Sequence, residues 1–577
     1  MITNLVLLAL PLVVTYLAAT VWHRRFKQFA NFPQLKPSLL WGHLKLIHEY
    51  TLKGPPDVHY DPVFATMAKE LGNPPVMFLD LRPASYPMVL VNSHEVAEQV
   101  TRVSKMFAWS TPKSPTMGAL KEDWKQLRKR FNPGFAPQHL MTLLPCIIDK
   151  TDIFMEHLDR LASSGEEFSM LKHTINLTFD IIGAITMDVD FDAQKSESSS
   201  QGEFIRLYDE LLKMYGQEDS RFPWWMSPMR EWRRYTLSNQ IDRLLETMIR
   251  AKHAEHNHHQ QQQHTTTTKT KKPRDVLSLS LQGSDTLDRA LLTETRDQIK
   301  TFLFAGHDTT GILLAWLFYE FSRSPHVLQA VRDELDELFG PDASPAAVRA
   351  RLLAPGGEEL INRMRYATAV VKEVLRVYPP AGTARMAPPG TGFTVTAEGK
   401  SYCLDGAIIY NCATIIQRDR AVFGETADDF VPERWLGDKA GIMSAGADEE
   451  SEKRDEAGRK FPPGAWRPFE RGPRNCIGQD LATIEARVIV AAVARRYDFV
   501  KVGLGELDLN EKGQPVMNDK GQYKVKAEMY NTAQVTAKPV DAMRMKDSAY
   551  SAYVDPQTIF SRSWPCRVAQ SFRDQIN

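Results

Sequence analysis

The sequence predicts a mainly α-helical protein with small β-sheets, and three observations support this fold class. Apolar residues recur at helical spacing over long stretches, for example 298–321, 327–339 and 367–377. Short apolar or alternating runs at 392–396 and 407–410 are typical of strands. Hydrophobic residues make up 43% of the 577 residues, which is enough for a large core.

The charge and the cysteine content exclude several classes of protein. Lysine plus arginine and aspartate plus glutamate both total 71, so no net charge attracts the chain to nucleic acid, and we expect no such partner. The cysteines are widely scattered, which argues against a disulfide framework and suits a reducing compartment where a thiol stays free. They stand at positions 146, 403, 412, 476 and 566.

The N-terminus has the pattern of a membrane anchor. Residues 1–22 contain no charged side chain, and the mostly apolar run from Leu5 to Trp22 approaches the length that a helix needs to cross a bilayer. A basic cluster follows at 23–27, which predicts a single transmembrane helix in the endoplasmic reticulum with the later residues in the cytosol. A cleaved signal peptide is the alternative, but it normally begins with basic residues, and none precedes this run.

Composition sets the expected boundaries along the rest of the chain. Residues 23–45 form a basic, proline-containing linker, and 46–546 form a single large domain. Within this domain, 251–274 is rich in His, Gln, Thr and Lys, so we expect a disordered insertion. A second insertion at 438–460 is densely charged and expected to be solvated. The role of the C-terminal extension 547–577 does not follow from its sequence.

One cysteine lies in a loop suited to hold a metal. Glycines at 472 and 478 flank Cys476 and allow a tight turn, while Arg474 offers a fixed positive charge. A helical pattern begins at Gln479, so the sulfur lies near a helix N-terminus, which favours the thiolate form. A structural, buried cysteine is the alternative for any single cysteine beside glycines.

Phe469, Gly472, Arg474, Cys476 and Gly478 stand at relative positions 1, 4, 6, 8 and 10, and this loop resembles the haem loop of the cytochrome P-450 family. The resemblance implies the cytochrome P-450 fold, with 46–546 as the catalytic domain. It also implies haem b as cofactor, with the Cys476 thiolate as the axial ligand of its iron and the other loop residues around it.

A second motif interrupts an apolar helix at 305–310, which reads Ala-Gly-His-Asp-Thr-Thr. The family has this pattern in its distal helix, so Gly306 is predicted to leave room for dioxygen, and Asp308 and Thr309 to deliver protons. The alternative is that small and hydroxyl residues allow close contact between helices.

Three further residues are predicted to stabilise the fold. Glu373 and Arg376 lie three apart on one helix face, and Arg434 follows in Pro-Glu-Arg-Trp. Taken alone, Glu373 and Arg376 would be read as a surface ion pair. The resemblance implies that the three form a buried charge network with a structural role.

The propionates of a haem need cationic partners. Trp124 and Arg128 match the family's Trp-x-x-x-Arg, and Arg385 resembles the arginine that contacts the second propionate. Arg474 completes this set. A solvated arginine is the alternative for Arg385.

The resemblance implies a monooxygenase that inserts one oxygen atom from O2 into a small apolar organic substrate. Electrons are expected from NADPH through a separate cytochrome P-450 reductase at the membrane, and the chain is expected to be a monomer. The sequence as a whole, including the motif at 305–310 and the His- and Gln-rich insertion, resembles fungal members of the family that act in secondary-metabolite pathways. An O2-independent haem-thiolate isomerase or dehydratase and a non-catalytic, membrane-held haem-binding protein are the alternatives.

Overall fold

The structure is a computed structural model of the whole chain. It describes residues 2–55, 57–107, 110–114, 124–195, 201–215, 227–263, 275–284, 286–436, 453–454 and 460–549.

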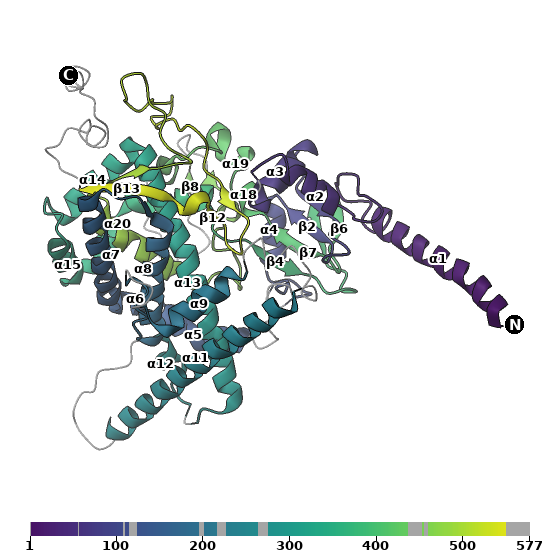
Figure 1. Cartoon of the computed structure of the whole chain (residues 1–577), viewed down its shortest axis with the longest axis horizontal. Coiled ribbons are helices and arrows are strands. Elements are labelled where there is room, and N and C mark those ends of the chain that lie inside the picture. Colours follow the sequence, from purple (N-terminus) through teal and green to yellow (C-terminus); the bar gives the residue numbers. More distant parts are fainter. Residues whose placement is uncertain are drawn as a thin grey trace. The chain divides into compact units, whose positions relative to one another are not determined.

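Two compact units make up the fold, and their segments alternate along the sequence. Unit 1 contains residues 1–123, 381–430 and 452–476. Unit 2 contains residues 124–380, 431–451 and 477–577. Most of the labelled helices in Figure 1 belong to unit 2, and the larger sheet belongs to unit 1, so the fold is mainly α with small sheets, as predicted.

Unit 1 is built around a four-stranded sheet in the order β1-β2-β7-β4. Strands β2 and β7 are parallel, with Met88 opposite Ile408, and the two outer pairs are antiparallel. A separate hairpin joins β5 and β6. The strands are β1 Val76–Leu79, β2 Met88–Val91, β4 Thr383–Met386, β5 Thr394–Ala397, β6 Lys400–Cys403, β7 Ile408–Asn411, β8 Lys453–Arg454 and β9 Lys460–Phe461. The helices are α1 Ile2–Phe26, α2 Leu44–Thr51, α3 Tyr60–Glu70, α4 His94–Thr101, α18 Ala413–Ile416 and α19 Arg420–Phe423, with 3-10 turns η4 Gly424–Thr426 and η6 Pro463–Ala465.

The segment predicted as a linker, 23–45, packs onto the core of unit 1. Phe29 stacks on Phe78 of β1 with ring centroids 4.4 Å apart. Arg25 is buried and lies 2.8 Å from the carboxylate of Asp80. The linker interpretation is therefore wrong, because apolar residues within this basic stretch bury their side chains against the sheet.

Helix α1 forms at the predicted place, but the prediction of a transmembrane anchor at 1–22 is not supported. Across the described part of the chain, no helix combines the length and apolarity that crossing a membrane requires.

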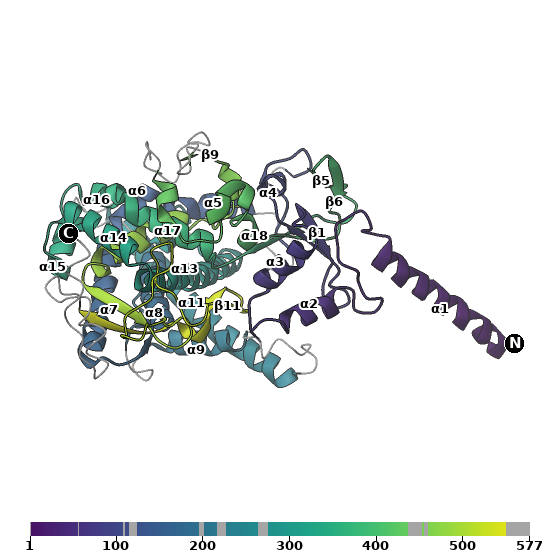
Figure 2. The ribbon, with the colours of Figure 1, turned by 90° about the horizontal axis from the view of Figure 1, so that it is seen from above.

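Unit 2 contains most of the described helices, which Figure 2 shows from above. They are α5 Trp124–Phe131, α6 Pro137–Thr142, α7 Leu144–Ser164, α8 Met170–Met187, α9 Glu203–Lys213, α11 Pro228–Gln263, α12 Val276–Ser280, α13 Arg289–Arg323, α14 Pro325–Phe339, α15 Pro345–Leu353, α16 Gly357–Arg363, α17 Arg365–Val377 and α20 Gln479–Val493. Its 3-10 turns are η2 Asn132–Phe135, η5 Pro432–Trp435 and η7 Val540–Ala542, and its strands are β3 Phe168–Ser169, β10 Tyr497–Lys501, β11 Asn531–Thr532, β12 Lys538–Pro539 and β13 Arg544–Ala549.

Helices α8 and α13 of unit 2 pack closely against each other. The Thr174 hydroxyl donates to the carbonyl of Gly311 at 2.8 Å, and the Thr178 hydroxyl donates to the carbonyl of His307 at 2.7 Å. A Cβ atom on Gly311 would lie 2.8 Å from Ile175, so the two backbones approach closely because this residue has no side chain.

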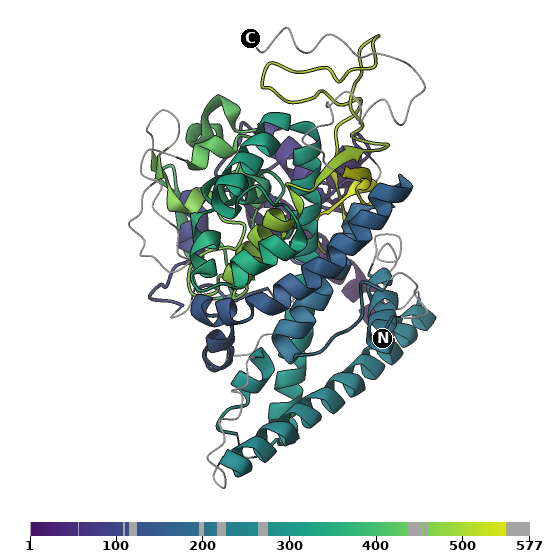
Figure 3. The same ribbon diagram turned by 90° about the vertical axis from the view of Figure 1, so that its left-hand side faces the viewer.

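Helix α11 corrects part of the prediction for 251–274. It continues through Gln263, so the first half of the predicted disordered insertion is helical, as Figure 3 shows. Apart from two alanines the segment 251–263 has no apolar residue, but alanine, glutamate and glutamine favour helix, and they extend a helix already begun at Pro228. Residues 264–274 lie outside the described residues.

The last described strand crosses the predicted boundary at residue 547. Strand β13 pairs with β10 and β3, and Asp547 lies opposite Phe499. The strand ends at Ala549, and the remainder of 547–577 lies outside the described residues. Most of the charged insertion 438–460 also lies outside them, apart from the short β8 and the first residue of β9.

Candidate active site

The loop that ends at Cys476 lies in unit 1 and is folded tightly on itself. The backbone N–H of Cys476 donates to the carbonyl of Phe469 at 2.9 Å, and that of Asn475 donates to Gly472 at 3.0 Å. Gly472 has φ +75°, and a Cβ atom there would lie 2.2 Å from the carbonyl oxygen of Thr101. Only glycine fits this position without strain. The thiol of Cys476 is exposed and forms no disulfide.

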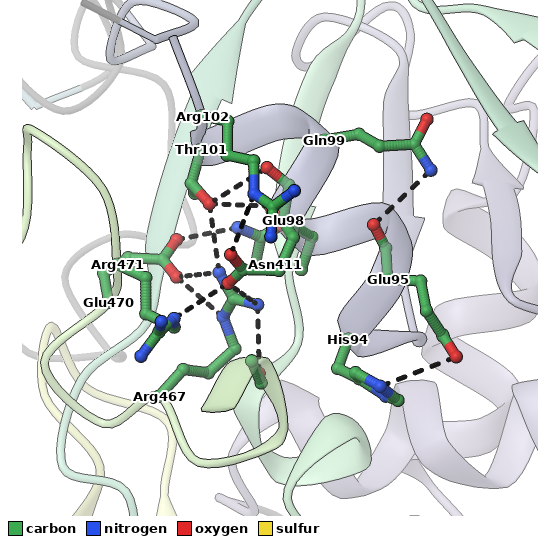
Figure 4. Close-up of polar contacts among 12 residues, drawn as sticks. His94, Glu95, Glu98, Gln99, Thr101, Arg102, Asn411, Arg467, Glu470 and Arg471 are labelled. Carbon is green, nitrogen blue, oxygen red and sulfur yellow. Dashed lines mark hydrogen bonds and ion pairs between the residues drawn. The ribbon is translucent and has the colours of Figure 1, made fainter. Parts of the chain in front are cut away.

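Ion pairs fix the loop in front of Cys476, as Figure 4 shows. The Arg467 guanidinium donates to Glu470 through Nε at 2.7 Å, and Asn411 Nδ2 donates to the other oxygen of that carboxylate at 2.7 Å. Arg471 donates to Glu98 of α4 at 2.9 Å. The loop is therefore joined both to β7 and to α4.

Sequence reasoning missed this network. The backbone N–H of Arg467 also donates to the side-chain oxygen of Gln417 at 2.8 Å, and both side chains are buried. The alternation of charge at Arg467, Glu470 and Arg471 was a possible signal, whereas nothing in the sequence indicated Glu98 or Gln417 as partners.

Helix α20 begins directly after the loop. Gly478 is its N-cap residue, and its carbonyl accepts from the N–H of Ala482 at 2.9 Å. Gly478 has φ −88°, so this position does not require glycine for its backbone conformation. Leu481, Ile484 and Val488 of this helix are buried in unit 2.

Arg385 is a fully buried cation on β4 of unit 1. Its Nη1 makes one long hydrogen bond to the carbonyl of Thr111 at 3.4 Å, whereas Nε and Nη2 have no partner within the described residues. Burial lowers the pKa of Arg385 to about 10. A buried guanidinium with two unused donors is suited to an anionic group.

Two further cations lie near Arg385 in unit 1. Burial and the positive charge of Arg385 lower the pKa of Lys113. The nearby Cys476 partly offsets this effect, because its negative charge would raise the pKa. Burial also lowers the pKa of Arg474. The structure therefore groups Arg385 and Arg474 around the cysteine loop, together with Lys113, which sequence reasoning missed because it stands in no motif.

Trp124 and Arg128 belong to unit 2 and lie on helix α5, which begins at Trp124 and has Arg128 in its last turn. Arg128 Nε donates to the side-chain oxygen of Asn132 at 2.8 Å, so this side chain already has one acceptor. The side chain of Trp124 lies outside the described part of the chain.

Gly306 and Thr309 lie on helix α13 of unit 2. A Cβ atom on Gly306 would lie 2.7 Å from Ile182 of α8, so the missing side chain permits the contact between these helices. This geometry favours the alternative role of Gly306 in helix packing, and its role toward dioxygen stays a prediction. The Thr309 hydroxyl donates to the carbonyl of Ala305 at 2.7 Å.

Asp308 has different partners from Thr309. Its side chain is 2% exposed and lies 2.9 Å from Nζ of Lys538 on β12. The Thr536 hydroxyl donates to the other carboxylate oxygen. Within the described residues Asp308 and Thr309 share no hydrogen bond, so each is positioned separately. Sequence reasoning did not identify Lys538 or Thr536, because they lie far along the chain.

Glu373, Arg376 and Arg434 form a buried network in unit 2. The Arg376 guanidinium donates to Glu373 at 2.8 and 2.9 Å, and Arg434 Nε donates to it at 3.0 Å. The backbone N–H of Val431 and the indole of Trp435 donate to the same carboxylate, each at 2.9 Å. Burial alone would raise the pKa of Glu373, but the two guanidinium groups hold it below its ordinary value.

Known proteins resemble the chain in both sequence and fold. The cytochrome P450 family model matches residues 47–527. The chain belongs to the cytochrome P450 family. It is 31% identical over 468 residues to the cytochrome P450 monooxygenase acrF of Aspergillus aculeatus, a match that covers 78% of this chain and 89% of that protein.

A second fungal relative and one crystal structure agree with this assignment. The cytochrome P450 monooxygenase polC of Polytolypa hystricis is 27% identical over 550 residues, covering 88% of this chain and 90% of that protein. The crystal structure of the cytochrome P450DA heme domain matches with a TM-score of 0.65 and 17% identity, over 90% of this chain and 98% of that one, which shows the fold. The chain is therefore a cytochrome P450 enzyme, an oxidoreductase of the monooxygenase type.

Cytochrome P450 membership implies haem with a cysteine thiolate as iron ligand. The residues of unit 1 fit such a group, because Cys476 has an exposed thiol and Arg385 has two buried donors that meet no acceptor among the described residues. A propionate carboxylate would supply the missing acceptor.

Proposed function

We propose that this cytochrome P450 inserts one oxygen atom from O2 into a small apolar organic molecule, with haem b held by the thiolate of Cys476. The main support is the exposed Cys476 thiol at the end of a loop that ion pairs fix in place. When bound, haem with a thiolate ligand supplies the activation of dioxygen.

The residues of the chain would contribute binding and proton transfer. Arg385 would bind a propionate through Nε and Nη2, which neutralises the buried charge. Thr309 holds a proton at Oγ1, which now points to the carbonyl of Ala305 and could turn toward a bound substrate. Lys538 lies 2.9 Å from the carboxylate of Asp308 and supplies a positive charge beside it in its buried position.

Electrons are proposed to come from NADPH through a separate reductase, and the substrate to belong to a fungal secondary-metabolite pathway. The fungal origin of acrF and polC supports the second proposal. Location at the endoplasmic reticulum stays a prediction from the sequence.

The ligand role of Cys476 is tested by Cys476→Ala, with Cys403→Ala as the control, since Cys403 is also exposed and free in unit 1. We expect Cys476→Ala to lose the red-shifted absorption band of the reduced carbon monoxide complex, whereas Cys403→Ala keeps it. Retention of this band by Cys476→Ala would show that another residue binds the iron.

The reaction class is tested with substrate pools extracted from a deletion strain. A monooxygenase consumes one O2 and one NADPH for each product formed, and one oxygen atom of the product comes from labelled O2. Product formation without O2 would instead identify the isomerase or dehydratase alternative.

A further inference from the structure

A tight turn at residues 38–42 of unit 1, called the apolar turn below, presents three consecutive apolar side chains to solvent. Leu39, Leu40 and Trp41 are 49%, 70% and 56% exposed. None of them belongs to the site described above. A run of three exposed apolar residues works against solubility, so it indicates a surface that contacts a partner.

Hydrogen bonds hold the apolar turn in one conformation. The backbone N–H of Ser38 donates to the carbonyl of Gly42 at 2.8 Å, and that of Gly42 donates back to Ser38 at 3.1 Å. The N–H of Trp41 donates to the Ser38 hydroxyl at 3.0 Å. Gly42 has φ +55°, and a Cβ atom there would lie 2.4 Å from the carbonyl oxygen of Asp80, so only glycine fits. Because the turn is already ordered, its side chains can bind a partner at little cost in conformational entropy.

The carbonyl groups of the apolar turn are paired inside the protein. Buried Arg25 donates through Nε to the carbonyl of Leu39 at 3.0 Å and through Nη2 to that of Leu40 at 2.6 Å. The carbonyl of Trp41 accepts from the N–H of Leu44 at 3.0 Å. With the Ser38 and Gly42 pairs, all five carbonyls of the turn have a partner. A segment that enters hydrocarbon must satisfy its polar backbone internally, whereas a protein interface admits bridging water, so this pairing favours a lipid surface.

The charges around the apolar turn fit anionic lipid headgroups. Residues 1–48 contain no aspartate or glutamate. Exposed basic side chains flank the turn in sequence at Arg24, Lys27, Lys36 and Lys45. Lys45 lies 3.7 Å from Glu49, and within the described residues no carboxylate pairs with the other three. Apolar residues with basic neighbours are typical of segments that lie in the interface of an anionic membrane.

We propose that the apolar turn inserts into the interface of an anionic lipid bilayer and docks unit 1 on it. Leu40 and Trp41 enter the boundary between headgroups and acyl chains, where tryptophan is favoured, and Lys36 contacts the headgroups. This docking uses the surface of unit 1 itself. It needs no membrane-spanning helix and does not depend on the proposed oxygen insertion.

Vesicle binding by the full-chain, haem-loaded protein tests the proposal. The vesicles contain phosphatidylcholine and phosphatidylserine in equal amounts, and bound protein is measured by co-sedimentation. Leu40→Ser removes an apolar contact and Lys36→Gln a positive charge, and both side chains are exposed, so folding is preserved. Leu353→Ser is the matched control, because it makes the same change at an exposed leucine of unit 2.

We expect Leu40→Ser to weaken vesicle binding about tenfold, Lys36→Gln about fivefold and the control less than twofold. All three variants should keep the absorption band of the reduced carbon monoxide complex, which reports intact haem binding separately from membrane binding.

Tryptophan fluorescence reports insertion at the turn itself. Trp41→Phe keeps an apolar ring, so the difference in emission between wild type and this variant isolates the signal of Trp41. We expect that signal to shift to shorter wavelength when vesicles are added and to be quenched by brominated phosphatidylcholine.

Three results would overturn the proposal. One is unchanged vesicle binding in Leu40→Ser or Lys36→Gln, and another is Trp41 emission that vesicles do not alter, because another surface would then make the contact. The third is a dimer in sedimentation velocity that Leu40→Ser dissociates, which would show that the turn binds a second copy of the chain instead.

Discussion

The ammonium group of Lys538 lies 2.9 Å from the carboxylate of Asp308 in the interior of unit 2. This ion pair joins β12, near the end of the described chain, to the middle of α13. It gives the buried carboxylate the counter-charge that its 2% exposure requires.

Lys538→Met is expected to destabilise the protein by about 1–3 kcal/mol, because Asp308 would lose its cation and stay buried. The lysine side chain is 20% exposed, so the loss is smaller than for a fully buried pair. Urea unfolding measures the change. In the Asp308→Asn background the same substitution should leave the unfolding free energy nearly unchanged. An equal loss of unfolding free energy in both backgrounds would show that Lys538 and Asp308 do not stabilise each other.

Thr309→Ala is expected to keep both the fold and the haem, because the hydroxyl bonds only to its own helix through Ala305. If Thr309 delivers protons, NADPH consumption will continue while product falls several-fold and hydrogen peroxide rises. Thr301→Ala is the matched control, since Thr301 donates in the same way to Asp297 on the same helix at 2.9 Å. Unchanged product per NADPH in Thr309→Ala would count against the proton-delivery role.

Glu373→Gln is expected to cost about 3–5 kcal/mol at pH 7, because Arg376 and Arg434 would be left as uncompensated buried charges. The pKa of Glu373 is depressed below its ordinary value of 4.5. Its stabilisation is therefore fully present above pH 4.5 and is lost as pH falls through the lower, folded-state pKa.

Urea unfolding at several pH values tests this dependence. The difference in unfolding free energy between wild type and Glu373→Gln should persist at pH 5 and narrow only below pH 4.5. Glu358→Gln, at an exposed position of α16, should lie within about 0.5 kcal/mol of wild type. If the unfolding free energies of wild type and Glu373→Gln differed by the same amount down to acid pH, the ionic role of Glu373 would be contradicted.

Gly306→Ala tests whether this glycine serves helix contact. Alanine would gain about 1 kcal/mol of helix propensity, but its Cβ would overlap Ile182, and such overpacking costs about 1–3 kcal/mol. We expect a net loss of stability in wild type and a gain in the Ile182→Ala background, measured by urea unfolding. The same loss in both backgrounds would point to a different constraint on residue 306.

The sequence was sufficient to predict several of the helices, and the family resemblance implied one buried network. Apolar periodicity identified α13 and α17, because their buried faces repeat at the helical period. The predicted start of α13 was late, since Asp288 caps the helix and its side chain accepts from the N–H of Leu291 at 2.8 Å. This cap lies in a polar stretch where apolar residues do not recur at helical spacing.

Contacts between distant segments could not be predicted. Glu373 and Arg376 share one helix, so their spacing indicated the pair, whereas Lys538 meets Asp308 only through the path of the folded chain. Polar composition also misled, because 251–263 is helical without an apolar face. The prediction gave more weight to the lack of apolar side chains that could be buried than to the residues in this segment that favour helix.

The burial of the Arg385 guanidinium has a consequence for the amount of folded enzyme in a cell. Within the described residues Nε and Nη2 of Arg385 have no hydrogen-bond partner, although the carboxylate of Glu470 acts on its charge, and an incompletely paired buried charge offsets part of the roughly 5–15 kcal/mol that keeps a domain folded. Newly synthesised chains that lack an anion at this residue would be open to proteolysis. The amount of intact enzyme in a cell would then follow the availability of tetrapyrrole more closely than the rate of translation.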